Sequence, residues 1–259
     1  MTTKARAYNS RELQACVAAR ILEDGRSVLV GTGLPIVASM LAQRSHAPRL
    51  LIVFEAGGIG PILPSLPVSV GDSRTFYRAV AASSMHDVMS MAQAGHMDFG
   101  FLGAAQIDAY GNINTTVIGD WEKPTVRLPG SGGANDVGSF CNRTIIIMQQ
   151  DPRRFVERLD FLTTPGYLDG PGARERAGLP KETGPYRVIT QLGVYDFETE
   201  TKRMRLLSAH PGVAIEDMTT NSGFTIILPR DIATTAPPTD EETKLLREID
   251  PLGMSLGGR

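Results

Sequence analysis

The stretch LLIVFEAGG (residues 50–58) decides the fold class of this chain. Its apolar part, residues 50–54, has the length and composition of a strand that is buried on both faces. Glu55 follows directly, and Gly57 and Gly58 then allow a ligand to approach the backbone. Open α/β sheets bind their ligands at such strand ends, so we predict that Glu55 is catalytic. The same position also suits a solvated loop residue or the cap of a following helix.

Apolar periodicity on both sides of this stretch predicts alternating helices and strands. Helices are predicted over residues 9 to about 23, 35 to about 44, 85–94 and 215–221, and from 240 onward. Strands are predicted over residues 27–30, 50–54, 97–103, 114–119, 143–149, 187–190, 193–198, 204–208 and 224–228. This order predicts an α/β fold with an open, mostly parallel sheet flanked by helices, formed by a single domain over residues 1–259.

Two long segments lack the periodicity of a helix or a strand. Residues 56–75 carry a proline at every third position from Pro61 to Pro67, which favours an extended path. A loop of this length within a compact domain is usually functional, and we predict that it closes over Glu55 as a lid. Residues 164–185 are dense in glycine and proline, and we interpret them as a surface excursion that contacts another protein chain.

The composition argues against several classes of function. A net charge of −2 and a pI of about 6.1 disfavour a nucleic-acid or acidic-membrane surface. No apolar run approaches the roughly 18 residues of a transmembrane helix, and the polar N-terminus has no signal-peptide core. Cys16 and Cys141 have no disulfide or metal spacing, so we expect a cytoplasmic protein in which both thiols are inert packing. The four histidines are scattered, and no metal site is expected.

Two further segments carry candidate site residues. Residues 130–135 (GSGGAN) are small and expose successive backbone N–H groups, which suit an anion or a developing oxyanion; the alternative is a flexible turn. Residues 103–112 contain Gln106 at a predicted strand end, followed by a hairpin-like turn over residues 108–112. The glycine pair at residues 31 and 33 lacks the rest of a dinucleotide fingerprint, so we do not expect NAD binding.

Taken together, several motifs resemble the β subunit of family I coenzyme A transferases, and in particular its glutaconate CoA-transferase branch. The resemblance runs over nearly the whole chain, with the motifs in order. They are GTGLP (31–35), IVFEAG (52–57), FLGAAQIDAYGNINTT (101–116), LPGSGGAN (128–135), DPRRF (151–155), DGPGARERAGLP (169–180) and NSGF (221–224).

The resemblance implies a fold similar to ribose-5-phosphate isomerase and a separate α subunit as partner, with αβ heterodimers joined into a higher oligomer. It places the catalytic glutamate at Glu55 and the oxyanion segment at Gly132, Gly133 and Ala134, and we add Gln106 as a candidate substrate-binding residue. Coenzyme A is then the group carried by the substrates, an acyl-CoA and a carboxylic acid, and no other cofactor is implied. The sequence has FEAGG where the succinate and acetoacetate branches have a SENG-type motif, so the acyl group stays open.

The chemistry expected of Glu55 is an exchange of thioesters through an enzyme-bound glutamyl-CoA on a dicarboxylic or short-to-medium acyl-CoA. Two alternatives stay open. One is an acyl-CoA hydrolase or decarboxylase on the same fold, as among relatives that lack the glutamate, which this chain retains. The other is a non-catalytic ligand sensor, against which the absence of a basic helix-turn-helix extension counts.

Overall fold

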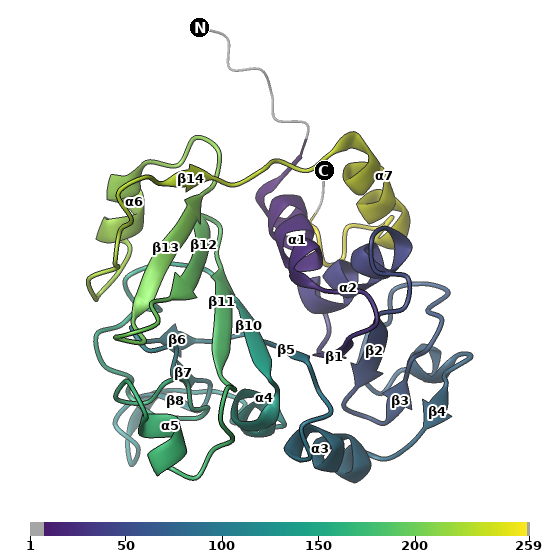
Figure 1. The fold of residues 1–259 in the computed structure, drawn as a ribbon, viewed down its shortest axis with the longest axis horizontal. Helices are drawn as coiled ribbons and strands as arrows, with labels where there is room; N and C mark the ends of the chain where they lie inside the picture. The colour runs from purple at the N-terminus through teal and green to yellow at the C-terminus, as the bar shows by residue number, and fades with distance from the viewer. Residues whose placement is uncertain (1–7, 258–259) are drawn as a thin grey trace, which may run out of the picture.

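One continuous sheet of ten strands runs through the computed structural model, which describes residues 8–257 (Figure 1). The spatial order of the strands is β14-β13-β12-β11-β10-β5-β1-β2-β3-β4. Their bounds are β1 (Ser27–Val30), β2 (Leu51–Phe54), β3 (Gly58–Ile59), β4 (Ala81–Ala82), β5 (Phe99–Leu102), β10 (Arg143–Ile147), β11 (Pro185–Ile189), β12 (Gly193–Phe197), β13 (Met204–Ala209) and β14 (Ala233–Thr234).

The five central strands, β11, β10, β5, β1 and β2, are parallel to one another. Antiparallel strands extend the sheet on both sides, with β12 beside β11 and β3 beside β2. Two short antiparallel pairs lie apart from this sheet: β6 (Gln106–Ile107) with β7 (Ile113–Asn114), and β8 (Val117–Gly119) with β9 (Pro124–Arg127). The structure confirms the predicted open, mostly parallel sheet, and the hairpin between β6 and β7 contains the predicted turn at residues 108–112.

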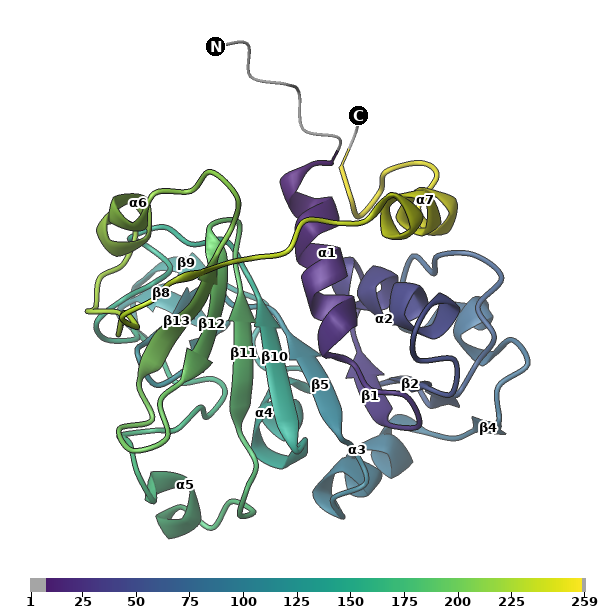
Figure 2. The ribbon, with the colours of Figure 1, turned by 45° about the horizontal axis from the view of Figure 1, so that its top comes forward.

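Helices cover both faces of the sheet (Figures 1 and 2). They are α1 (Ser10–Ile21), α2 (Leu34–Arg44), α3 (Met85–Gln93), α4 (Ala134–Phe140), α5 (Ala173–Arg176), α6 (Ile215–Thr220) and α7 (Asp240–Ile249). Side chains of α1, α2 and α7 pack against one face, where Val28 and Val30 of β1 point. Leu29 points the other way, into a second core that includes side chains of α3 and α4.

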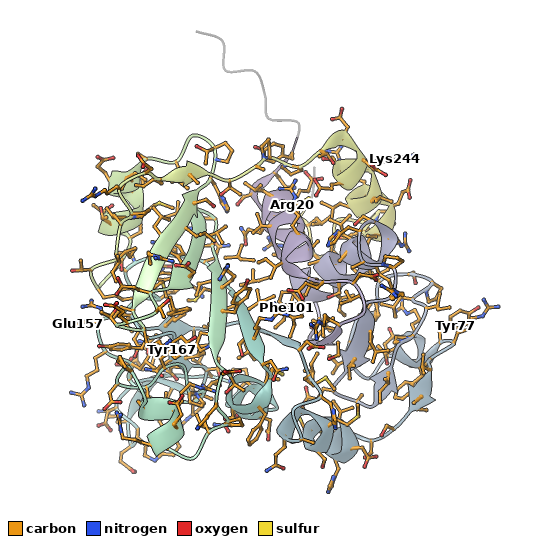
Figure 3. All side chains as sticks on the ribbon, in the orientation of Figure 1. Arg20, Tyr77, Phe101, Glu157, Tyr167 and Lys244 are labelled. Atoms are coloured by element: carbon orange, nitrogen blue, oxygen red, sulfur yellow. The ribbon has the colours of Figure 1, made fainter. Side chains whose placement is uncertain are left out.

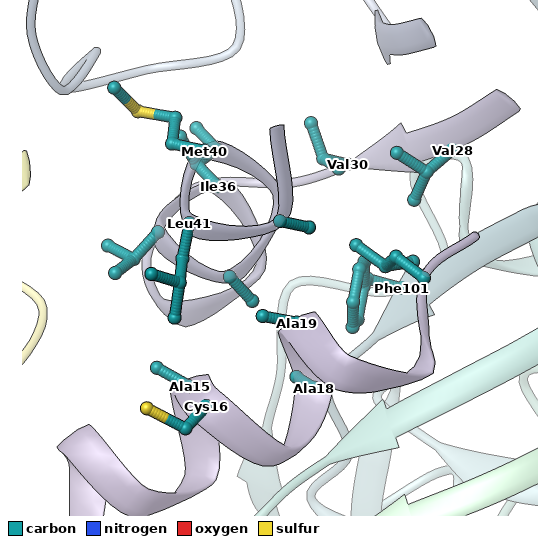
Figure 4. Packing of buried hydrophobic residues seen from close by; sticks show 14 of the residues in the cluster. Ala15, Cys16, Ala18, Ala19, Val28, Val30, Ile36, Met40, Leu41 and Phe101 are labelled. Carbon is teal, nitrogen blue, oxygen red and sulfur yellow. The ribbon is translucent and has the colours of Figure 1, made fainter. Parts of the chain in front are cut away.

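Small side chains let α1 lie close to α2. Figure 4 shows Ala15, Ala18 and Ala19 of α1 beside the α2 side chains, with Val28, Val30 and Phe101 next to them. Phe101 of β5 is buried near the centre of the molecule (Figure 3), so this packing extends from the helices onto the middle of the sheet. An alanine side chain loses no rotamer entropy when the helix forms, and its small size allows the backbones of α1 and α2 to approach closely.

The chain changes direction between β1 and β5, which are neighbours in the sheet. From β1 it continues through α2 to β2 on one side, whereas from β5 it continues to α4 and β10 on the other. Because α2 and α4 cover opposite faces, the carboxyl ends of β1 and β5 diverge and leave a crevice between them. Ligands of open α/β sheets bind at such a switch point.

Most predicted elements are confirmed to within a few residues, including the capping boxes at Asn9 and Ser84. The predicted strand at residues 224–228 is wrong. Only Ile227 pairs with β13, because β14 occupies the next part of the same edge at Ser208 and Ala209. The predicted strand at residues 114–119 is interrupted, because Asn114 Oδ1 accepts the N–H groups of residues 116 and 117 and turns the chain between β7 and β8.

α4, β9 and several shorter elements were not predicted from the sequence. α4 has seven residues, too few to establish a helical period, and it begins at the end of the glycine-rich segment. The proline-containing loop at residues 56–75 is mostly irregular, but it includes β3 and the start of a 3₁₀ turn over Ser73–Phe76.

Both thiols are buried, as predicted, and burial raises the pKa of Cys16 and of Cys141 to about 12. Each thiol is therefore protonated at neutral pH and unsuited to nucleophilic chemistry. No helix within residues 8–257 has the length and apolar character needed to cross a membrane.

Gly100 of β5 sets how closely α4 packs on the sheet, because a Cβ there would lie 2.5 Å from Val137 Cγ1 and 2.8 Å from Cys141 Sγ. We expect Gly100→Ala to lower the free energy of unfolding by about 1–3 kcal/mol through overpacking. Urea denaturation measures this change. The control is Gly71→Ala at an exposed position with open space, which should change stability by less than about 0.5 kcal/mol. Equal stability of the two variants would contradict this account of the α4 contact.

Candidate active site

A cavity of about 440 Å³ opens at the carboxyl ends of β1, β2 and β5. Its floor consists of residues at the ends of these strands, including Gly31, Leu102 and Gly103. Its lining also includes Glu55, the segment from Leu128 to Ala134, and Val137 of α4. The structure therefore brings together Glu55 and the glycine-rich segment, which are about 75 residues apart in the sequence.

Two glycines fix the position of Glu55 at the end of β2. Gly57 has φ +111°, and a Cβ there would lie 2.0 Å from the Ser83 carbonyl oxygen. A Cβ on Gly58 would lie 2.1 Å from the Thr75 carbonyl oxygen. The Gly57 N–H donates to Phe54 O at 2.9 Å, and its carbonyl accepts from Ser83 N at 2.9 Å. The chain therefore turns sharply after Glu55 in a way that only glycine allows.

The glycine-rich segment is held by Thr115. The Thr115 hydroxyl donates to Gly130 O at 2.8 Å, and the Gly130 N–H donates to Thr115 O at 2.9 Å. Gly130 and Gly132 have positive φ values of +92° and +49°, so the backbone between them curls before α4 begins. Thr115 belongs to a motif that the sequence analysis quoted, but its role at the cavity was missed because nothing local to residues 114–119 indicates it.

The structure refines which backbone groups of this segment are free. The Ala134 N–H donates to Ser131 O at 2.9 Å, so it is engaged within the loop. The N–H groups of Gly132 and Gly133 have no protein acceptor within residues 8–257. The oxyanion role that the resemblance assigns to Gly132, Gly133 and Ala134 thus rests, in this conformation, on the N–H groups of the two glycines.

The Glu55 carboxylate lies close to Gly133. A Cβ on Gly133 would lie 2.9 Å from Glu55 Oε1 and 2.7 Å from Met89 Cε. In the part of the chain that the structure describes, the Glu55 carboxylate has no hydrogen bond and no ion pair. The cavity therefore presents an uncommitted carboxylate beside uncommitted backbone donors, which is the arrangement that acyl transfer requires.

Gln106 lies outside this cavity. Its side chain is 5% exposed, and its Nε2 donates to Asp160 Oδ2 at 2.9 Å. Its Oε1 accepts from Asn114 Nδ2 at 2.7 Å. Asp160 Oδ2 also accepts the Gly119 N–H at 3.0 Å, so Gln106 joins the β6–β7 and β8–β9 pairs. Both ends of its amide group have protein partners in this structure, and its predicted contact with the substrate stays a prediction.

A buried arginine anchors the far end of α4. Arg174 is 3% exposed, and its guanidinium donates to the carbonyl oxygens of Gly138 and Ser139 near the C-terminus of α4 and to Gly166 O. Burial lowers its pKa, and cations at a helix C-terminus are favourable. Residues 164–185 therefore hold α4, and through it the glycine-rich segment, in place; their predicted contact with another protein chain stays a prediction.

No group of three histidine, cysteine or acidic side chains suited to a metal ion occurs among residues 8–257.

The contact between Gly133 and Glu55 is testable by adding one methyl group. We expect Gly133→Ala to displace the Glu55 carboxylate, which ends a flexible side chain, and to lower the expected CoA-transfer turnover by about 10²-fold. The free energy of unfolding should change by less than about 1 kcal/mol, because flexible side-chain ends absorb the clash. Initial rates and urea denaturation measure the two effects, with Gly71→Ala as the control for the stability measurement. A folded Gly133→Ala protein with an unchanged rate would show that this contact has no part in the chemistry.

Known proteins are similar to this chain in sequence over most of its length. The model of the family "Coenzyme A transferase" matches residues 12–221. The B subunit of glutaconate CoA-transferase from Acidaminococcus fermentans is 38% identical over 94% of this chain and 93% of its own length. The B subunit of 3-oxoadipate CoA-transferase from Pseudomonas knackmussii is 39% identical, with 94% of both chains covered.

Solved structures agree. Glutaconate coenzyme A-transferase from A. fermentans superposes with a TM-score of 0.92 at 37% identity, covering 98% of this chain and 99% of that one. The decarboxylase AibA/AibB superposes with a TM-score of 0.83 at 27% identity, covering 97% and 99%. Sequence and fold thus agree over nearly the full length, and the chain belongs to the coenzyme A transferase family as a β subunit of family I.

Proposed function

We propose that this chain supplies the nucleophile of a two-subunit CoA-transferase, which moves CoA between an acyl-CoA and an acceptor carboxylate through a glutamyl-CoA thioester on Glu55. The observation that carries the proposal is the uncommitted Glu55 carboxylate in contact with Gly133 inside an open cavity. The names of the relatives, which include CoA-transferases for glutaconate and 3-oxoadipate, support a dicarboxylic or short-to-medium acyl group.

The reaction begins when a Glu55 carboxylate oxygen attacks the thioester carbonyl carbon of the acyl-CoA. The C–S bond breaks, CoA leaves as a thiolate, and a mixed anhydride joins Glu55 to the acyl group. The thiolate then attacks the Glu55 carbonyl carbon and releases the acyl group as its free acid, which leaves a glutamyl-CoA thioester. An acceptor carboxylate repeats both steps in reverse. One thioester is exchanged for another, so the overall reaction is nearly thermoneutral.

Every tetrahedral intermediate in this sequence carries an oxyanion, for which the N–H groups of Gly132 and Gly133 are the available donors. Removing one such donor typically costs about 2.7–4 kcal/mol of transition-state stabilisation. Because Glu55 has no protein partner within residues 8–257, its lone pairs are available for attack without first breaking a hydrogen bond or an ion pair.

Anhydride and thioester both hydrolyse, so water must be kept out of the cavity during turnover. We assign this task to the loop that follows Glu55 and to the α subunit. The lobe at residues 60–85 carries exposed apolar side chains: Val80 is 79% exposed, and Tyr77, 47% exposed, points outward at the edge of the molecule (Figure 3). Such a surface suits a protein partner. The decarboxylase AibA/AibB is named as a pair of chains, which supports an α subunit here.

The proposed assembly is a higher oligomer of αβ heterodimers in the cytoplasm. The competing function is an acyl-CoA hydrolase or decarboxylase, which the likeness to the AibA/AibB decarboxylase favours. A hydrolase uses water in place of the acceptor acid, and a decarboxylase releases CO₂ from the acyl group. Neither forms a new acyl-CoA from an added acid, so that product identifies CoA transfer.

Shortening Glu55 separates these functions. Glu55→Asp withdraws the carboxylate by about 1.5 Å, and a misplacement of about 1 Å costs about 10²-fold in a positioned reaction. We expect this variant of the αβ complex to lose CoA transfer but to keep or gain acyl-CoA hydrolysis, because the aspartate is able to activate a water molecule in the vacated space. Glu55→Ala should lose both activities.

Transfer is measured with isotopically labelled acid and hydrolysis by release of free thiol, with this chain alone as the inactive control. Wild-type transfer by Glu55→Ala would place the chemistry elsewhere and refute the proposed role of Glu55.

A further inference from the structure

A second cavity, of about 400 Å³, opens at the same edge of the sheet as the Glu55 cavity. It lies on the face that α1 and α2 cover, and its lining includes Thr32, the first residues of α2, and Arg11 and Gln14 of α1. Leu102 and Gly103, at the end of β5, line both cavities. The two hollows therefore meet over the ends of β1 and β5, where the chain direction in the sheet reverses.

The lining of this second cavity favours an anion. It contains no aspartate or glutamate among residues 8–257, and Arg11 is its charged side chain. The N-terminus of α2 opens into it without a side-chain cap, since Gly33 occupies the cap position. The N–H groups of Leu34 and Ile36 have no acceptor in the described chain. Unpaired N–H groups and the helix dipole both attract negative charge.

Gln14 supplies an independent indication of a ligand. Its side chain is 1% exposed and lines the cavity, yet only one end of its amide group has a partner, Ser10 Oγ at 3.1 Å from Nε2. The other end has no partner within residues 8–257. This end is not enclosed by protein, so it is open to a ligand in the cavity. A flip of the amide, with Ser10 then donating to Oε1, would turn the free –NH₂ toward a bound carboxylate.

We infer that this second cavity binds the distal carboxylate of a dicarboxylic acyl group whose other end reacts at Glu55. The inference rests on the proposed function and adds the residues that would select a dicarboxylic substrate over a monocarboxylic one. Neighbouring strands are about 4.8 Å apart, so the end of β5 lies roughly 10 Å from that of β2, which carries Glu55. With carbon–carbon bonds of about 1.5 Å, the two carboxyl carbons of a five- or six-carbon diacid lie roughly 5–6 Å apart, so the side chains of Glu55 and Arg11 supply the rest of the reach between the two hollows.

The test compares two acceptors of equal chain length, glutarate and pentanoate, with acetyl-CoA as donor and the αβ complex as enzyme. We expect the wild-type complex to prefer glutarate. Arg11→Gln and Gln14→Leu should each raise the KM for glutarate by about 10-fold, the value of one hydrogen bond to a charged group. The kcat, and both constants for pentanoate, should stay within about twofold of wild type.

The matched control is Arg153→Gln, which removes an arginine whose side chain is 92% exposed. It should change neither the KM nor the kcat for either acid. If Arg11→Gln and Gln14→Leu raised the KM for both acids equally, the cavity would instead bind the CoA arm that is common to all reactions. If neither variant changed the KM for glutarate, the distal carboxylate would bind elsewhere. Either result overturns the inference.

Direct binding separates this inference from the proposed function. Glutarate should bind the Glu55→Ala complex in isothermal titration calorimetry and bind about 10-fold more weakly when Arg11→Gln is added. This result would support the cavity even if the wild-type complex transferred no CoA, in which case the proposed function alone would fail. Equal binding with and without Arg11 would overturn the assignment of the cavity while leaving transfer through Glu55 intact.

Discussion

A Cβ at residue 133 would lie 2.9 Å from the Glu55 carboxylate, so even a methyl group there displaces the side chain proposed as the nucleophile. The surrounding structure maintains this close approach. Gly57 and Gly58 turn the chain sharply after β2, so Glu55 projects into the cavity. On the opposite side, Thr115 holds the glycine-rich segment by its start, and Arg174 holds α4, which continues it. The proposed nucleophile and the proposed oxyanion donors thus come from distant parts of the chain but are fixed by short, local contacts.

The parallel sheet explains why these contacts meet at one place. Because β1 leads to one side of the sheet and β5 to the other, their carboxyl ends leave a crevice with a hollow on each face. One hollow contains the proposed nucleophile, and the other contains Arg11, the start of α2 and the half-satisfied Gln14. A single substrate that reaches over the strand ends would use both, with the thioester at Glu55 and a carboxylate at the far end.

The sequence predicted the parts of this arrangement that depend on local pattern. The apolar run before Glu55 indicated β2, and the family resemblance brought Glu55 and residues 132–134 into one site. Features that depend on tertiary contacts were not predictable. The Asn114 side chain interrupts a predicted strand. β14 pairs with the edge of β13 beside which residues 224–228 were predicted to form a strand. The side chains of Asp160 and Asn114 hydrogen-bond both ends of the Gln106 amide group. Asp160 lies 54 residues from Gln106, and the turn made by Asn114, although local, is hidden within an alternating pattern.

The central claim is that Glu55 becomes a thioester during turnover, and the most direct measurement is to trap that thioester. The αβ complex is incubated with acyl-CoA without an acceptor acid, treated with borohydride, and analysed by peptide mass spectrometry. A thioester is reduced to an alcohol whereas a free carboxylate is not, so the account predicts a mass loss located at Glu55 that appears only after exposure to acyl-CoA. An unchanged Glu55, together with modification of another residue in an active complex, would contradict it.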